Sequence, residues 1–318
     1  MSPARPKVLI IDQMHESIVP LLEEKGFAAS YRPDTLAVEV PQILEPFEVL
    51  LLRSKLPITE ELLAHAPNLK VIGRAGAGLD QIDLQAVERR GIALLHAAEG
   101  NRDAVAEHAM GMLLCLLNKL HIADRQVRKS QWLREANRGW ELAGKTVGII
   151  GLGCMGQAFA RRLAGFGCRV LAYDTSHKGV GLPGVEEVSL PELQAQADVV
   201  SLHIPLTEAN RCLINQEYLE GFRKNIVLIN TSRGEVLPLA DLVAALKSGK
   251  VWAAALDVLE NEKVQQLSPA QQANFDYLIT SDRVLLSPHV AGWTYESYEK
   301  INQVLVQKLA RVLAPTGL

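Results

Sequence analysis

Three residues in the second half of the chain have side chains that can do chemistry, and each follows a short apolar run. They are Arg233 in "INTSRGEVL", Glu262 in "LDVLENE" and His289 in "LSPHVAGWT". A guanidinium binds a carboxylate through two parallel hydrogen bonds, and an imidazole gives or takes a proton near neutral pH. A carboxylate can orient such an imidazole and stabilise its charged form. Taken singly, each has a plainer interpretation: a solvated arginine, an exposed charge run or a structural histidine.

The apolar runs before these residues belong to a pattern that extends along the whole chain. A first series contains "KVLIID", "EVLLLRS", "LKVIGRAG" and "IALLHA", and a second contains "KTVGIIGLG", "CRVLAYD", "ADVVSLHIP", "NIVLINTSRG", "VWAAALDV" and "RVLLSPH". Amphipathic or turn-rich segments separate them, which predicts an α/β fold with doubly wound parallel sheets. Ligands bind at the carboxyl ends of the strands in such sheets. The shared position of Arg233, Glu262 and His289 therefore favours one joint site.

The length of 318 residues favours two domains. Residues 103–129 are compatible with one long helix, and the polar and aromatic segment "SQWLREANRGWELAG" that follows resembles a surface connector. We expect a nucleotide-binding domain at residues 101–288. The last helix-like segment, "YESYEKINQVLVQKLARVL", has no strand after it and can pack back on the first domain. That domain would then be discontinuous, made of residues 1–100 with 289–318.

A glycine-rich turn opens the second series. Gly151, Gly153 and Gly156 have the GxGxxG spacing, directly after a strand-like run and before a helix-like one. The first glycine makes the turn, the second lets the backbone approach a pyrophosphate, and the third lets the helix pack on its strand. The backbone N–H groups of Cys154 and Met155 would face the phosphates at the helix N-terminus. Alone, the motif could be only a tight turn in an empty domain.

An acidic residue after the second strand of that series separates these alternatives. Asp174 lies 18 residues beyond Gly156, at the end of "CRVLAYD". A carboxylate there can accept hydrogen bonds from ribose hydroxyls. Its charge would also repel the extra phosphate of NADP, so the sequence favours NAD as the cofactor.

The composition points to small-molecule partners. A net charge of -3, with 22% charged residues, favours neither nucleic acid nor a membrane surface as a partner. Four cysteines without CxxC spacing indicate reduced thiols, and the N-terminus lacks the apolar core of a signal peptide, so we expect a cytoplasmic protein. The longest apolar stretch is interrupted by Glu107 and His108 and is too short for a membrane span. No set of ligand residues has metal-site spacing, and we expect no metal.

The ordered motifs resemble those of the D-isomer-specific 2-hydroxyacid dehydrogenase family over nearly the full chain. They are "GRAGAGLDQIDL", "NRDAVAEHAMGMLL", "GLGCMG", "LHIPLT", "NTSRGEV", "ALDV" and "SPHVAG". The resemblance implies two Rossmann-like domains, one flavodoxin-like and split between the chain ends, the other NAD-binding. It implies hydride transfer between a D-2-hydroxy acid and its 2-oxo acid. Arg233 would bind the substrate carboxylate, His289 would be the acid/base, and Glu262 would orient the imidazole and stabilise its protonated form.

The resemblance also implies cofactor and substrate contacts. Asp257 matches the position that hydrogen-bonds the nicotinamide carboxamide. His203 could be a second acid, but its counterpart lies along the cofactor cleft, and neither His96 nor His108 has a stronger claim to catalysis. The expected cofactor contacts beyond the glycine-rich turn and Asp174 are His203, Pro205, Thr231, Ser232, Arg233, Asp257, His289 and Gly292. The expected substrate contacts are Arg53, Ser54, Arg74, Ala75, Gly76, Ala77, Arg233 and His289.

The pattern around Arg53 and Arg74 looks most like that of phosphoglycerate dehydrogenases. Together with Lys55, these residues supply cations for an extra phosphate, although they could instead form a solvated basic rim. We expect 3-phosphoglycerate, or hydroxypyruvate and glyoxylate in the reverse direction, as substrate. We expect no regulatory domain after the last helix.

Two departures from the family pattern bear on the site. Lys263 follows Glu262 where the family often has proline, and the connector after it is long, so the loop geometry around Glu262 is open. Trp293 stands where a small or polar residue is usual, and its ring could narrow the substrate pocket.

Two expectations about partners follow from the resemblance. The family includes nicotinamide-sensing corepressors that act as scaffolds, which is the alternative to an enzyme. The family is usually dimeric, so residues 104–117 and the arm "SQWLREANRGWEL" are expected to bury a partner surface in a homodimer. The plainer interpretation of these segments is a core helix and a surface loop.

Overall fold

The computed structural model describes residues 5–313 and divides into two compact units. The first consists of Met1–Asn101 with Trp293–Leu318, and the second of Arg102–Gly292. The first boundary between the units follows Asn101, next to the expected start of the nucleotide-binding domain at residue 101. The second boundary follows Gly292, four residues beyond the expected end at 288, so His289 is in the second unit. The physical reason is the Asp257 carboxylate, which accepts hydrogen bonds from Ser287, Val290 and Ala291.

The first unit is built on a sheet that, within residues 5–313, has five parallel strands in the order β2-β1-β3-β4-β5. This is the flavodoxin-like order. The strands are β1 Lys7–Ile10, β2 Ala28–Tyr31, β3 Val49–Leu52, β4 Val71–Arg74 and β5 Ala93–His96. The sequence predicts all of them except β2. That strand lies at the sheet edge and is partly exposed, so it lacks a continuous apolar run.

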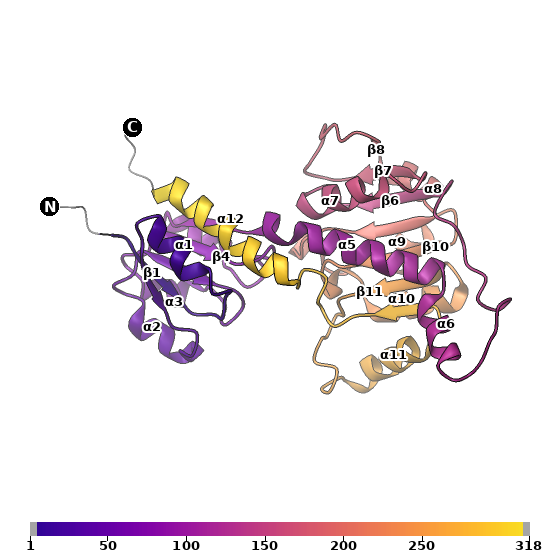
Figure 1. Cartoon of the computed structure of the whole chain (residues 1–318), viewed down its shortest axis with the longest axis horizontal. Coiled ribbons are helices and arrows are strands. Elements are labelled where there is room, and N and C mark those ends of the chain that lie inside the picture. Colours follow the sequence, from indigo (N-terminus) through magenta and orange to yellow (C-terminus); the bar gives the residue numbers. More distant parts are fainter. Residues whose placement is uncertain (1–4, 314–318) are drawn as a thin grey trace. The chain divides into compact units, whose positions relative to one another are not determined.

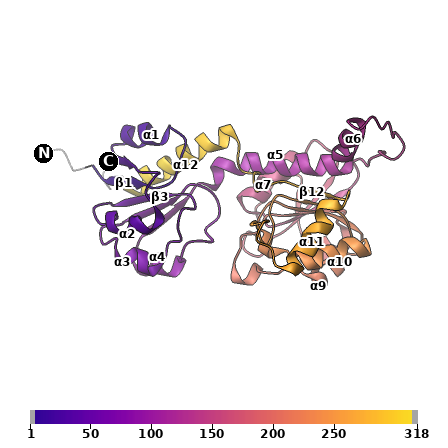
Figure 2. The same ribbon diagram turned by 90° about the horizontal axis from the view of Figure 1, so that it is seen from below.

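Helices cover both faces of this sheet, as Figure 2 shows, with α1 and α12 on one side and α2, α3 and α4 on the other. Their bounds are α1 Ile18–Glu24, 3-10 helix η1 Ala37–Glu39, α2 Val40–Ile43, α3 Glu60–Ala64, α4 Leu84–Arg89 and α12 Tyr295–Leu313. Two buried apolar clusters lie between the helices and the sheet, one on each face. The fully buried strands read as continuous apolar runs for this reason.

The C-terminal helix α12 belongs to the first unit. It lies beside α1 and against β4 and β5 (Figure 1). Its Ile301 approaches Gly100 so closely that a methyl group on Gly100 would lie 2.6 Å from the Ile301 Cα atom. Lys308 Nζ lies 2.8 Å from both carboxylate oxygens of Glu99 and 2.8 Å from the His96 carbonyl oxygen. These contacts attach the end of the chain to its first hundred residues.

The second unit holds a sheet that, in the described part of the chain, has seven parallel strands in the order β12-β11-β10-β9-β6-β7-β8. The bounds are β6 Thr146–Ile150, β7 Arg169–Tyr173, β8 Val185–Glu187, β9 Val199–Leu202, β10 Ile226–Asn230, β11 Val251–Leu256 and β12 Val284–Leu286. The sequence predicts all of these strands except β8, a short and partly exposed edge strand. The predicted fold class, α/β with two doubly wound parallel sheets, is confirmed.

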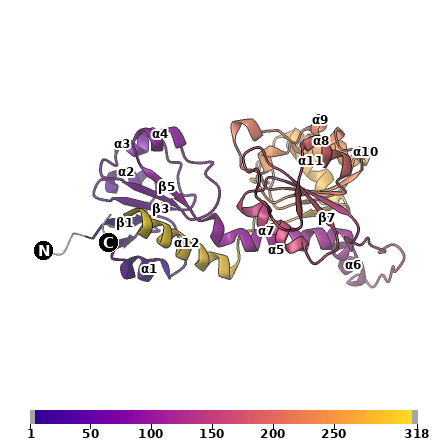
Figure 3. The same ribbon diagram turned by 90° about the horizontal axis from the view of Figure 1, so that it is seen from above.

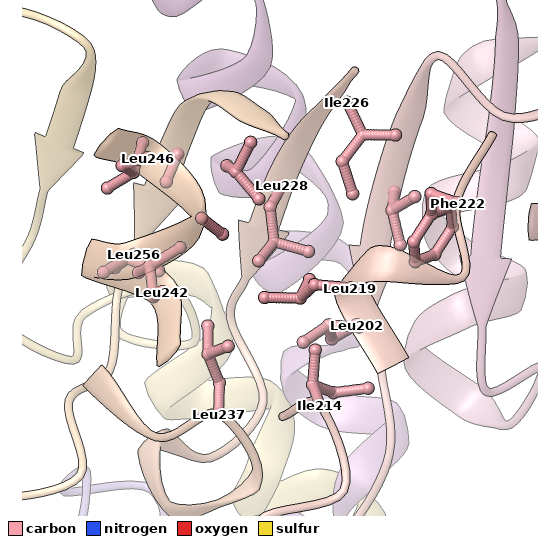
Figure 4. Packing of buried hydrophobic residues seen from close by; sticks show 14 of the residues in the cluster. Leu202, Ile214, Leu219, Phe222, Ile226, Leu228, Leu237, Leu242, Leu246 and Leu256 are labelled. Carbon is pink, nitrogen blue, oxygen red and sulfur yellow. The ribbon is translucent and has the colours of Figure 1, made fainter. Parts of the chain in front are cut away.

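Two helical layers enclose this sheet, with α5 and α7 on one face and α8 to α11 on the other (Figure 3). Figure 4 shows the second layer from close by: Leu219, Phe222, Leu242 and Leu246 pack against strand residues such as Leu228. The bounds are α5 Ala98–Leu117, α6 Leu120–Val127, α7 Cys154–Leu163, α8 Leu190–Gln196, 3-10 helix η2 Glu208–Asn210, α9 Gln216–Glu220, 3-10 helix η3 Gly234–Val236, α10 Leu239–Ser248 and α11 Pro269–Thr280.

Residues 103–129, a helix-compatible stretch in the sequence, belong mostly to two helices. Helix α5 ends at Leu117 and α6 begins at Leu120, because Lys119 has a left-handed backbone with φ 52°. Among residues 5–313, no helix combines the length and apolar character needed to cross a bilayer.

Candidate active site

The polar residues predicted to carry function follow the carboxyl ends of neighbouring strands in the second unit. Strand β6 ends before Gly151, β7 before Asp174 and β9 before His203. Strands β10, β11 and β12 end before Thr231, Asp257 and Ser287, respectively. The strand order reverses between β6 and β9, and this is the place where open parallel sheets bind ligands.

The turn after β6 depends on its glycines, because a side chain at two of them would clash with the backbone and the third borders open space. Gly151 has φ 94°, and a Cβ there would lie 2.5 Å from the His203 carbonyl oxygen. A Cβ on Gly156 would lie 1.9 Å from the Gly151 carbonyl oxygen. At Gly153 the nearest atom is His177 Cε1 at 3.8 Å, which leaves open space at the helix N-terminus beside Cys154. The arrangement fits a pyrophosphate.

Asp174 is held by the backbone around it. Its carboxylate accepts hydrogen bonds from the N–H groups of Leu152 at 2.6 Å, Ser176 at 2.7 Å and His177 at 2.8 Å. Burial opposes ionisation, but these hydrogen bonds outweigh it, and the pKa of Asp174 lies below its ordinary value. A negative charge is therefore present near neutral pH at the end of β7.

The turn after β10 is fixed by Asn230, a fully buried residue that sequence reasoning missed. Its amide nitrogen donates to the Arg233 carbonyl at 2.9 Å, and its Oδ1 accepts from Ser232 N at 3.0 Å and Ser232 Oγ at 2.7 Å. The Thr231 hydroxyl is buried and has no hydrogen-bond partner among residues 5–313. An orphaned hydroxyl fits a ligand that would supply the missing partner. The sequence feature that could have pointed to Asn230 is its place as the polar last residue of an apolar strand.

Glu262 and His289 come together although they lie on different loops. His289 Nδ1 is 2.8 Å from Glu262 Oε1 and 3.1 Å from Oε2. The side chains are 49% and 47% exposed, so the pair contributes at most about 1 kcal/mol to stability. The interaction uses Nδ1 and leaves Nε2 as the atom that can face a ligand. Lys263 donates its backbone N–H to Asn261 Oδ1 at 3.0 Å, a hydrogen bond that proline could not make.

The backbone of His289 has φ 55°, in the left-handed region, which costs a residue with a side chain roughly 1–2 kcal/mol. Asp257, which is 1% exposed, accepts hydrogen bonds from Ser287 Oγ at 2.6 Å, Val290 N at 2.9 Å and Ala291 N at 2.8 Å. The loop that carries His289 is therefore anchored to the end of β11.

His203 and Pro205 follow β9. The His203 ring lies 5.3 Å from that of Phe159, and its Nε2 is 2.9 Å from Ser201 Oγ. Desolvation lowers the pKa of His203 to about 4, so the ring is neutral at neutral pH. Pro205 accepts a hydrogen bond from Asn210 Nδ2 at 2.9 Å through its carbonyl oxygen.

In the first unit, Asp12 holds the loop after β3. Its Oδ2 accepts from the N–H groups of Arg53 at 2.6 Å, Ser54 at 3.2 Å and Lys55 at 3.3 Å. The Arg53 guanidinium lies 4.1 Å from the centre of the Trp293 ring, a cation–π arrangement. The bulky Trp293 ring thus positions Arg53.

The loop after β4 carries the remaining expected substrate contacts. Arg74 Nη1 donates to the Ala75 carbonyl at 2.7 Å. Gly76 has φ 151°, and a Cβ there would lie 2.1 Å from Arg74 Nη1. The Gly76 N–H donates to the Arg74 carbonyl at 2.9 Å, and Ala77 follows. Gly292, an expected cofactor contact, ends the second unit.

A parallel sheet with this strand order and a GxGxxG turn after β6 defines a Rossmann-type dinucleotide-binding domain. Residues 110–291, more than half of the chain, match the family model described as "D-isomer specific 2-hydroxyacid dehydrogenase, NAD binding domain". The chain belongs to the D-isomer-specific 2-hydroxyacid dehydrogenase family and is an enzyme of that family. The family expected from the sequence motifs is confirmed.

Known relatives resemble the chain over nearly its full length. Hydroxypyruvate reductase of Thermotoga maritima is 34% identical over 310 residues, covering 98% of this chain and 99% of that protein. D-3-phosphoglycerate dehydrogenase of Archaeoglobus fulgidus is 33% identical over 308 residues, covering 96% of this chain but 57% of that protein. The crystal structure of a glyoxylate reductase from Paecilomyes thermophila matches with a TM-score of 0.86 at 26% identity, covering 99% of this chain and 97% of the other.

The lowered pKa of His203 predicts an acid-sensitive second unit. Between pH 6.5 and 4 the unfolded chain binds a proton at this histidine and the folded chain does not, so the free energy of unfolding falls as the pH falls. The loss approaches roughly 3 kcal/mol. We expect His203→Gln, which can keep the hydrogen bond to Ser201, to lose less stability than the wild type between pH 7 and 4.5 in urea denaturation. Equal losses would contradict this prediction.

Proposed function

We propose that the chain is an NAD-dependent oxidoreductase that interconverts a D-2-hydroxy acid and its 2-oxo acid, with 3-phosphoglycerate or hydroxypyruvate and glyoxylate as substrate. The observation that carries the proposal is the contact between His289 Nδ1 and the Glu262 carboxylate at 2.8 Å. It joins a proton carrier and an orienting carboxylate in the unit that has the dinucleotide turn.

His289 is the acid/base of this reaction. When bound, the nicotinamide cofactor supplies or accepts the hydride. In the reducing direction His289 Nε2 gives a proton to the carbonyl oxygen of the 2-oxo acid, and in the oxidising direction it takes the hydroxyl proton back. Glu262 keeps its hydrogen bond to Nδ1 throughout, so its negative charge stabilises the doubly protonated ring.

Arg233 binds the carboxylate of the substrate. Its guanidinium is planar and permanently charged, which suits two parallel hydrogen bonds to that group. Asn230 bonds to both Ser232 and Arg233, so the turn that presents the guanidinium is rigid. Orientation of the substrate by Arg233 places the reacting carbon for hydride transfer.

The cofactor is held at the carboxyl ends of the strands of the second sheet. Gly151, Gly153 and Gly156 leave space for the pyrophosphate, and Thr231 offers a buried hydroxyl. The contacts proposed in addition are Cys154, Met155, His203, Pro205, Ser232, Asp257 and Gly292. The charge on Asp174 supports NAD over NADP, because it can accept from ribose hydroxyls and repels a 2′-phosphate.

The substrate assignment rests on the first unit and on the relatives. Arg53 and Arg74 provide cations on the loops after β3 and β4, and Trp293 fixes the guanidinium of Arg53. The contacts proposed in addition are Ser54, Ala75, Gly76 and Ala77. The named relatives reduce hydroxypyruvate or glyoxylate or oxidise 3-phosphoglycerate, as their names state. A fixed cation and a bulky ring favour a short, polar acid.

We expect turnover when the protein is mixed with NADH and a panel of hydroxypyruvate, glyoxylate, phosphohydroxypyruvate and pyruvate. The loss of NADH absorbance should be fastest with one of the first three, and NADH should be preferred to NADPH by roughly tenfold or more, since a charged contact is worth about 1.5–3 kcal/mol.

His289→Ala should lower kcat by about 100-fold or more while NADH still binds. Full activity of His289→Ala would overturn the acid/base assignment. Cofactor binding without turnover of any acid would favour the corepressor-like scaffold.

We also infer a homodimer that uses the arm after α6, whereas the apolar side chains of residues 104–117 are mostly buried in the second unit's own core. On that arm Trp132 is 83% exposed and Leu133 is 47% exposed, and Leu120 at the start of α6 is 55% exposed. Exposed apolar side chains gathered on one segment indicate a protein interface. Sedimentation at micromolar concentration should give twice the mass of the chain, and Trp132→Ser should weaken the association. A wild-type monomer under these conditions would contradict the dimer.

A further inference from the structure

The loop from Ser287 to Ala291 bends so that successive N–H groups converge on one carboxylate. Val290 N and Ala291 N both donate to Asp257, at 2.9 and 2.8 Å, and His289 N donates to the Asp257 carbonyl at 2.7 Å. A left-handed residue is what turns adjacent N–H groups toward a common anion. The unusual backbone of His289, with φ 55°, is thus coupled to this carboxylate.

A hydrogen-bond chain extends from the carboxylate to a helix. The Asp257 carboxylate has no hydrogen to give, so the Ser287 hydroxyl must be the donor across their 2.6 Å contact. That uses the only hydrogen of the hydroxyl. Ser287 Oγ therefore accepts from His108 Nε2, which lies 2.9 Å away. The hydrogen bonds therefore run from His108 to Ser287 and from Ser287 to Asp257. This direction requires a hydrogen on His108 Nε2.

Helix α5 gives this chain a rigid starting point. His108 lies on α5 between the buried residues Ala106 and Ala109, and Met112, one turn further along, places its sulfur 3.9 Å from Ser287 Oγ. The helix is packed into the apolar cluster of the second unit. The packing of α5 therefore fixes the backbone of His108 beside Ser287, and the 2.9 Å contact joins its ring to the hydroxyl.

We propose that His108 and Ser287 are positioning residues of the reaction, which hold the loop so that His289 meets Glu262. This inference rests on the proposed role of His289 as the acid/base. The two loops that carry His289 and Glu262 have separate origins, after β12 and after β11, so their side chains meet only while both loops are fixed. Neither His108 nor Ser287 needs to touch the substrate.

The test compares two variants that remove one of the hydrogen bonds between His108, Ser287 and Asp257 with two variants that keep them. Ser287→Ala and His108→Leu remove a link, whereas Ser287→Thr and His108→Gln keep a hydroxyl or an N–H donor. With the best acid of the panel, we expect the first pair to lower kcat by about tenfold and to raise the solvent deuterium isotope effect, because proton transfer becomes slower. The KM of the acid and the NADH dissociation constant, measured by fluorescence, should stay within about twofold. The second pair should keep most of the rate.

Two further measurements separate this role from a general loss of structure. The imidazole nitrogen NMR spectrum should show His108 with its hydrogen on Nε2, and Ser287→Ala should change that signal. The double variant His108→Leu with Ser287→Ala should be no slower than the worse single variant, because both act through one chain. His121→Leu is the matched control: it removes a histidine that bonds to the Asp282 carbonyl at 3.0 Å, and it should retain activity.

The outcomes distinguish this proposal from the function on which it rests. If His289→Ala remains active, the acid/base assignment itself fails. If His289→Ala is inactive while Ser287→Ala and His108→Leu match the wild type in kcat and isotope effect, only the positioning role is overturned. It is also overturned if the conservative variants are as slow as the disruptive ones, or if NADH binding weakens in parallel with kcat.

Discussion

Burial of the Asp257 carboxylate is the constraint on which the second unit's site depends. A carboxylate removed from water must find hydrogen-bond donors, and a neighbouring loop is the source of Asp257's donors. Satisfying that need draws the residues after β12 onto the end of β11. The same requirement imposes the left-handed backbone of His289 and brings its ring to Glu262. A single buried charge thereby converts a strand-end loop into a fixed support for a proton carrier.

Much of the fold follows from local sequence, because buried parallel strands are continuous apolar runs. The edge strands β2 and β8 lack such runs, since edge strands are partly exposed, and they were missed for that reason. The break between α5 and α6 was missed because it depends on one left-handed residue, Lys119, of a type that seldom adopts that conformation. The second domain boundary shifted because hydrogen bonds to Asp257, invisible in a local pattern, bind residues 287–291 to the second sheet.

The candidate site was predictable to a different extent. The motifs identify residues whose side chains can take part in the reaction, such as Arg233 and His289. Both residues follow the carboxyl ends of strands in the second sheet. The residues that hold them in place, Asn230, Ser287 and His108, lie inside the quoted motifs, but no motif indicates the contacts through which they act. His108 and Ser287 are 179 positions apart, so their contact exists only in the folded chain. Trp293 is expected from the sequence to narrow a pocket, and the contact that the structure gives its ring is with the Arg53 guanidinium.

The most direct test of the central constraint is the crystal structure of the Asp257→Asn variant. An asparagine presents one oxygen and one NH₂ group, so at least one of the three donors that now face the carboxylate would face another donor. The loop must then rearrange. We expect His289 to leave the left-handed region and its Nδ1 to move out of hydrogen-bond distance of Glu262. An unchanged loop, with the backbone and the contact to Glu262 both retained, would contradict it.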